Sequence, residues 1–272
     1  MRSSSIGGKL ASVFRSKSKS PEIGNDCQAN ANTSMSSRYQ EDIDEESDSE
    51  PPLQPIELHG YKDTTQHKLL STELAEELRA HVPSILQISH NWTLLYSMEQ
   101  NGTSLNTLYS CSAPTKDKNV SKRRGYFLII RDSNHDVFGA YLNDYLRPSE
   151  NRRYYGNGDC FLWKSEVAKV KHITRAPEFE DADTHIRRTS TVTEDDDEQV
   201  RLKIFHYTSI NDFIIYSNHD FISIGSGNGK FGLWIDSNLD KGASDFVETF
   251  GNERLSRDSQ FHVLGLELWK IT

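Results

Sequence analysis

Residues 222–236 read Ile-Ser-Ile-Gly-Ser-Gly-Asn-Gly-Lys-Phe-Gly-Leu-Trp-Ile-Asp, and this stretch decides the fold. Two apolar segments flank four glycines: Gly225, Gly227, Gly229 and Gly232. Glycine loses more backbone entropy on folding than other residues, so this density indicates turns with a positive φ or a close approach of two backbones. Both flanks are rich in β-branched and aromatic residues, as strands are. The stretch predicts strand, glycine-rich turn, strand, with a positive φ at Gly227 and Gly229.

The same glycines also match a phosphate-binding pattern, G-x-G-x-x-G, from Gly227 to Gly232. That pattern binds a dinucleotide where a strand precedes it and a helix follows it. Here a strand-like segment around Trp234 follows, so no helix N-terminus would face a phosphate. A structural hairpin is therefore the favoured interpretation, and a nucleotide site is the alternative.

Charge is distributed unevenly along the 272 residues, whose formal net charge is -9. Residues 1–20 carry five basic and no acidic side chains, whereas residues 21–57 carry ten acidic and one basic. Residues 174–199 carry nine acidic and three basic side chains. The rest is nearly neutral, unlike a nucleic-acid-binding domain, which has a basic face. Acidic segments with little apolar content do not fold by themselves.

These shifts in composition predict the domain organisation. We expect a disordered N-terminal tail over 1–57, basic over 1–20 and acidic over 21–57, and a linker over 58–67. A single domain over 68–272 follows, with a disordered acidic insertion over 174–199. Within that insertion Ser190 follows Arg187 and Arg188, a pattern typical of basophilic kinase sites, and is a candidate phosphorylation site.

Short strands with polar turns dominate the predicted domain. Ser71 can cap a helix that runs to Ala80, and Gly102 precedes a second short helix. The tetrapeptide Ser-Asn-His-Asp occurs at 133–136 and again at 217–220, each time between apolar segments, and we interpret both copies as hairpin turns rather than catalytic His-Asp pairs. The fold class is therefore α+β, mainly β, with two packed antiparallel sheets and a few short helices.

The cysteines and apolar runs limit the functional classes. Cys27, Cys111 and Cys160 have no metal-binding or redox spacing, which fits a reducing, intracellular environment and no metal or cofactor. No apolar run approaches the 18 or so residues that a membrane-spanning helix needs. The basic, acid-free residues 1–20 also resemble a mitochondrial presequence.

Several motifs in order make the chain similar to the TLDc family: Leu69-Leu70-Ser-Thr-Glu-Leu-Ala, Trp92-Thr-Leu-Leu-Tyr-Ser97, Phe138-Gly-Ala-Tyr141, Tyr154-Tyr-Gly-Asn-Gly-Asp159, the stretch from Gly227 to Asp236, and Gly265-Leu-Glu-Leu-Trp269. The resemblance covers about residues 70–272 apart from the insertion, and the compact form is most similar to fungal members associated with oxidation resistance. It implies a β-sandwich flanked by helices. It also implies that these positions define the fold: Gly156, Gly158, Gly225, Gly227, Gly229, Gly232, Trp234 and Asp236.

The resemblance further implies a role in oxidative-stress resistance and a partner, the soluble catalytic sector of the vacuolar proton-pumping ATPase, whose assembly or disassembly the protein would regulate. The family has no established catalytic residues, so we expect a non-catalytic protein, monomeric when free, in the cytoplasm with recruitment to the vacuolar membrane. Two alternatives stay open: a thiol-based antioxidant enzyme or scavenger, and a mitochondrial adaptor protein. Val247 stands where members often have a cysteine, which weakens the thiol hypothesis. Asp159 stands where members have a glutamate.

Overall fold

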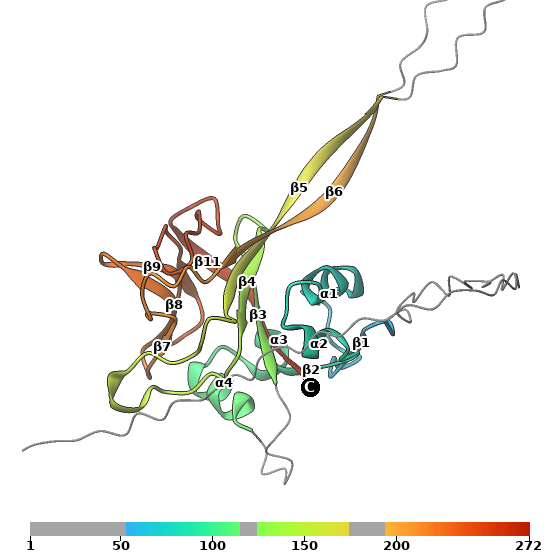
Figure 1. The fold of residues 1–272 in the computed structure, drawn as a ribbon. Helices are drawn as coiled ribbons and strands as arrows, with labels where there is room; N and C mark the ends of the chain where they lie inside the picture. The colour runs from blue at the N-terminus through green and yellow to red at the C-terminus, as the bar shows by residue number, and fades with distance from the viewer. Residues whose placement is uncertain (1–52, 115–123, 174–193) are drawn as a thin grey trace, which may run out of the picture. The chain divides into compact units, whose positions relative to one another are not determined.

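The computed structural model describes residues 53–114, 124–173 and 194–272, which form short helices and mostly antiparallel strands (Figure 1). The helices are α1 Thr72–Arg79, α2 Ser84–Gln87, α3 Met98–Asn101, α4 Leu105–Ser112 and the 3-10 turn η1 Glu150–Arg152. The strands are β1 Glu57–His59, β2 Asn91–Ser97, β3 Gly125–Asp132, β4 Val137–Leu142, β5 Phe161–Ile173, β6 Glu194–His206, β7 Ile215–Ser217, β8 Phe221–Gly227, β9 Lys230–Asp236, β10 Lys241–Ala243 and β11 Gln260–Ile271.

Strand β11 connects two sheets. Its first residues pair with β10, which continues the order β10-β9-β8-β7 of the second sheet. Its later residues lie between β3 and β2 in the first sheet, which continues through β4 and β5 to β6. All these pairs are antiparallel, and β1 alone adds a parallel pair, with β2. The predicted fold class, mainly β with antiparallel sheets and few short helices, is confirmed.

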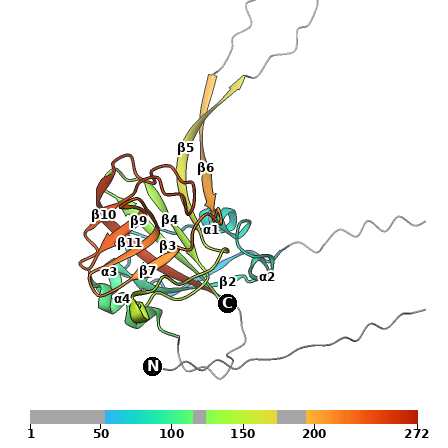
Figure 2. The same cartoon turned by 60° about the vertical axis from the view of Figure 1, so that its left-hand side comes forward.

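Two hydrophobic clusters cover the two faces of the first sheet. One face packs against the second sheet: Leu128, Ile130 and Leu162 join Ile224 and Leu233 in one buried cluster, which α4 also enters. The orange and green strands that meet in this layer are adjacent in both ribbon views (Figure 1 and Figure 2). The opposite face packs against α1 and α2 and contains three fully buried tryptophans: Trp92, Trp163 and Trp269.

The predicted helix and strands form where the local sequence favours them. Ser71 caps α1, because its side-chain oxygen accepts a hydrogen bond from the Leu74 N–H (3.2 Å). Leu78 of α1 is fully buried against the first sheet. Both Ser-Asn-His-Asp tetrapeptides lie between paired strands: the first joins β3 to β4, and the second connects β7 to β8. These turn predictions therefore agree with the structure.

Two boundaries differ from the expectations. Residues 58–67, expected as a linker, contribute to β1 and place Tyr61 against Trp269, because β2 offers β1 an unpaired edge. Strand β6 begins at Glu194, inside the insertion expected over 174–199, because β5 continues to Ile173 and pairs with it residue by residue. The tail over 1–52, with its expected basic and acidic parts, and insertion residues 174–193 lie outside the described residues.

Candidate functional site

The glycines of the β8–β9 hairpin serve different purposes. Asn228 and Gly229 form the two-residue turn with φ of 52° and 75°, which suits the primed turns of tight hairpins. Gly225 has a φ of 73° and donates its N–H to the Ile214 carbonyl (2.7 Å). Gly232 has no room for a side chain, because a Cβ would lie 2.7 Å from Leu162 Cδ1. Gly227 has neither a positive φ nor a close neighbour, so the expected positive φ there is wrong.

The rest of the hairpin also serves the fold. Trp234 is half-buried and pairs across the sheet with Ser223. Asp236 ends β9 and accepts hydrogen bonds from the Asp240 and Lys241 N–H groups (2.9 and 3.1 Å). A strand, not a helix, follows the glycines, so the arrangement lacks the helix N-terminus that a dinucleotide site requires.

The glycine turn before β5 packs against β7. Gly156 has a φ of 92°, and a Cβ there would lie 2.9 Å from Ile215 Cδ1. Gly158 lies under the Tyr207 ring, because a Cβ at position 158 would lie 3.0 Å from Tyr207 Cδ1. The neighbouring Tyr155 donates its N–H to the Ile215 carbonyl (2.9 Å). Gly156 therefore allows this loop to lie close to β7 of the second sheet, and Gly158 allows it to lie close to Tyr207, which follows β6.

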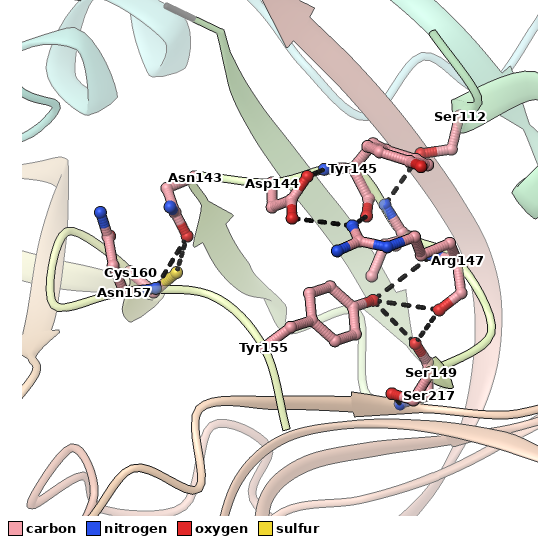
Figure 3. A network of polar contacts seen from close by, with 11 residues as sticks. Ser112, Asn143, Asp144, Tyr145, Arg147, Ser149, Tyr155, Asn157, Cys160 and Ser217 are labelled. Atoms are coloured by element: carbon pink, nitrogen blue, oxygen red, sulfur yellow. Dashed lines mark hydrogen bonds and ion pairs between the residues drawn. The ribbon is translucent and has the colours of Figure 1, made fainter. Parts of the chain in front are cut away.

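Arg147 is the centre of a polar network that joins this loop to β7 (Figure 3). Its guanidinium lies over the rings of Tyr145 and Tyr155 (4.6 and 4.5 Å) and donates to the Asp144 carboxylate (2.7 Å). Its carbonyl accepts from the Ser217 hydroxyl (2.5 Å). The guanidinium, the carbonyl and the Tyr155 hydroxyl all have partners within the network, which fits a role in positioning the loop.

The described cysteines differ in burial. Cys160 is fully buried, and its thiol donates to Asn143 Oδ1 (3.1 Å; Figure 3). Burial raises the pKa of the Cys160 thiol to about 11. The reactive form of cysteine is the thiolate, so Cys160 is poorly suited to consume peroxide at neutral pH. Cys111 is half-buried on α4 and packs against the main core. Val247 is also buried, beside Gly225 and Gly232.

Neither histidine of the two His-Asp pairs hydrogen-bonds to a serine or cysteine side chain among the described residues. Asp136 forms an ion pair with Arg257 (3.1 Å), and His135 has a φ of 62° in its turn. His219 Nδ1 lies 3.3 Å from the Asn106 side-chain oxygen. In the part of the chain that the structure describes, no three His, Cys, Asp or Glu residues are grouped as a metal site would require. Nor is any helix there long and apolar enough to cross a membrane.

A cavity of about 350 Å³ lies beside the bend of β11. We call it the Arg131 cavity; four separate segments line it: His67 and Leu69, Ser97 to Glu99 with Thr103, Arg131, and Leu264 to Glu267. The register between β11 and β3 shifts between Val263 and Gly265, so Leu264 is the extra residue of a β-bulge and is 50% exposed. Bulges often re-aim side chains next to binding sites.

Arg131 and the carboxylates of Glu99 and Glu267 line the Arg131 cavity. Glu267 is 1% exposed and accepts from the Tyr61 hydroxyl (2.7 Å), the Leu69 N–H (3.1 Å) and the Trp269 indole N–H (2.9 Å). Burial raises the pKa of the Glu267 carboxyl above its ordinary value, although these donors oppose the shift. Arg131 is half-buried, and its Nε is buried without an acceptor among the described residues.

Sequence reasoning did not find this cavity. The available signal was a charged residue in each of two otherwise apolar strands: Arg131 ends an apolar run in β3, and Glu267 interrupts another in β11. Charged residues are seldom buried unless they are paired. Candidate site Ser190, with Arg187 and Arg188, lies outside the described residues.

Comparison with known proteins gives the family. The profile of the TLDc domain matches residues 64–272. The chain is 43% identical over 256 residues to oxidation resistance protein 1 of Debaryomyces hansenii, covering 81% of this chain and 76% of that protein. It is 39% identical to the proteins of the same name from Kluyveromyces lactis, covering 93% and 92%, and Saccharomyces cerevisiae, covering 82% and 80%. The chain belongs to the TLDc domain family, as its motifs indicated.

Proposed function

We propose that this protein contributes to oxidative-stress resistance as a binding module rather than as an enzyme. The observation that carries the proposal is its similarity, over most of the chain, to three fungal proteins named oxidation resistance protein 1. The buried Cys160 thiol and the internally satisfied Arg147 network support a non-catalytic role. A protein of this kind acts through its surface.

The partner we propose is the soluble catalytic sector of the vacuolar proton-pumping ATPase, whose assembly the protein would regulate. The resemblance to the TLDc family supports this partner. Binding would recruit a cytoplasmic protein to the vacuolar membrane. A mitochondrial pool is a separate part of the proposal and depends on the basic residues 1–20.

The test uses the full chain with purified soluble sector and with vacuolar membranes that carry the assembled pump. We expect co-purification with the soluble sector and a changed fraction of that sector on sedimented membranes. A full-length variant with Cys27, Cys111 and Cys160 replaced by serine is the matched control. It should bind equally and restore peroxide resistance equally to cells that lack the protein.

Two results would contradict parts of this proposal. If the soluble sector neither binds nor changes its membrane-bound fraction, the proposed partner is wrong. If the cysteine-free variant binds normally but no longer protects cells, thiol chemistry accounts for the protection. A fusion of residues 1–25 to a reporter tests the mitochondrial pool, and a reporter that stays outside mitochondria excludes it.

A further inference from the structure

The Arg131 cavity combines an arginine that has an unpaired buried donor with an apolar rim. The buried Nε of Arg131 has no acceptor among the described residues. A buried donor without an acceptor is destabilising. The rim carries Leu264, which is 50% exposed, and the half-buried Met98 and Leu69. These features are complementary to a ligand with both an anionic and an apolar group.

The two acidic residues of the cavity do not neutralise Arg131. Glu99 accepts hydrogen bonds from the N–H groups of Gln66 and His67 (2.7 and 2.9 Å), and His67 Nδ1 lies 3.6 Å from the same carboxylate. Glu267 accepts three hydrogen bonds, from the Tyr61 hydroxyl, the Trp269 indole N–H and the Leu69 N–H. Both carboxylates therefore already have donors, and Arg131 remains available to an incoming anion.

We propose that the Arg131 cavity is a docking site for an acidic side chain, flanked by an apolar residue, on a segment of a partner protein. A carboxylate is the anion that a guanidinium recognises best, because two parallel N–H···O bonds can form. The flanking apolar residue packs against Leu264. This inference does not depend on the identity of the partner proposed above.

The size and position of the cavity favour a protein segment over a free small molecule. At about 350 Å³ it lies at the lower limit of cavities that enclose drug-sized ligands, which range over roughly 300–1,000 Å³. Such a volume suits one or two side chains better. Leu264 projects beside the cavity from a β-bulge and is half exposed, and arginine is enriched at the centres of protein interfaces.

The experiment titrates the full chain with two matched peptides, acetyl-Leu-Glu-Leu-amide and acetyl-Leu-Gln-Leu-amide, and with hexanoate as a free small acid. Methyl NMR signals of Met98 and Leu264 report binding. We expect saturable shifts with the glutamate peptide and about tenfold weaker binding of the glutamine peptide. A hydrogen bond to a charged group contributes about 1.5–3 kcal/mol, and about 1.4 kcal/mol corresponds to a tenfold change in the dissociation constant. The preference should shrink near 1 M salt, where the Debye length is about 3 Å.

Two variants distinguish binding by the Arg131 guanidinium from a general effect of positive charge on the protein. Arg131→Gln should remove the preference for the glutamate peptide, whereas Arg257→Gln, at an exposed arginine outside the cavity, should keep it. Equal binding of both peptides to the wild-type chain overturns the proposal, even if Arg131→Gln does not fold. So does the absence of saturable shifts at Met98 and Leu264. Binding of hexanoate without either peptide overturns the protein segment as occupant.

Discussion

The β8–β9 hairpin allows two glycines, two positions apart, to be compared under the same substitution. Valine at position 229 must take a φ near the 75° of Gly229, in the left-handed region that β-branched residues rarely adopt. Valine at position 227 meets neither a positive φ nor any atom within 4 Å of its Cβ. Only the first substitution should therefore strain the backbone.

The expected magnitudes follow from this geometry. A left-handed conformation costs roughly 1–2 kcal/mol for an ordinary L-residue, and more for a β-branched one, so Gly229→Val should lower the free energy of unfolding by about 2 kcal/mol. For a domain of this size, that corresponds to a fall in Tm of roughly 4–8 °C. Gly227→Val should stay within about 0.5 kcal/mol of the wild type.

A third variant identifies φ as the cause. Asparagine tolerates the left-handed region, so Gly229→Asn should recover most of the stability that Gly229→Val loses. Urea unfolding followed by tryptophan fluorescence measures all three variants. The reasoning is refuted if valine is equally harmful at both positions. It is also refuted if asparagine is as harmful as valine at position 229.

Three further predictions concern other parts of the chain. Cys160→Ser should leave the free energy of unfolding within about 1 kcal/mol of the wild type, because serine can keep the hydrogen bond to Asn143. The native Cys160 thiol should resist alkylation at pH 7 until urea exposes it, because burial raises its pKa. Burial raises the folded-state pKa of Glu267, so the wild type should lose stability relative to Glu267→Gln as pH rises above about 4.5. Urea unfolding at several pH values measures the difference in stability between the two proteins, and a difference that does not change with pH contradicts the prediction. Replacing residues 174–193 by Asn-Gly should leave the Tm within about 3 °C, because that sequence has little apolar content and loop length costs little closure entropy; a much lower Tm in calorimetry contradicts this.

The parts of the fold that depend on local sequence could be predicted. The Ser71 cap, the turn at Asn228 and Gly229, and the strands on either side all depend on residues close together in the chain. β1 could not be predicted in the same way. Its three residues are mainly polar, and it is held by parallel pairing with β2 and by the Tyr61 hydroxyl on Glu267, contacts with residues far along the sequence.

The alternation of residue types in β11 describes the burial of its side chains only in part. In the sequence, Leu264, Leu266 and Leu268 alternate with Gly265, Glu267 and Trp269, a pattern that indicates a strand. Leu266 and Leu268 do face the main core, but Trp269 is buried on the other face, because α1 and α2 cover that side of the first sheet. Leu264 is exposed because the bulge removes it from the pairing with β3. A period of two identifies a strand but does not reveal a bulge or a covered second face.

The bend of β11 is also where the residues that sequence reasoning missed come together. β11 must leave the second sheet and enter the first within one strand. The bulge at Leu264 follows its pairing with β10 and the first pair with β3, Val263 with Asp132, and precedes the rest of its pairing with β3 and its pairing with β2. The bulge turns Leu264 outward beside Arg131, which directly precedes Asp132 at the end of β3. A strand that connects two sheets therefore also produces an exposed apolar residue next to an arginine whose buried Nε has no acceptor among the described residues. Since neither residue belongs to the TLDc motifs that the sequence displays, the family resemblance identifies the scaffold, whereas the cavity follows from how β11 bends.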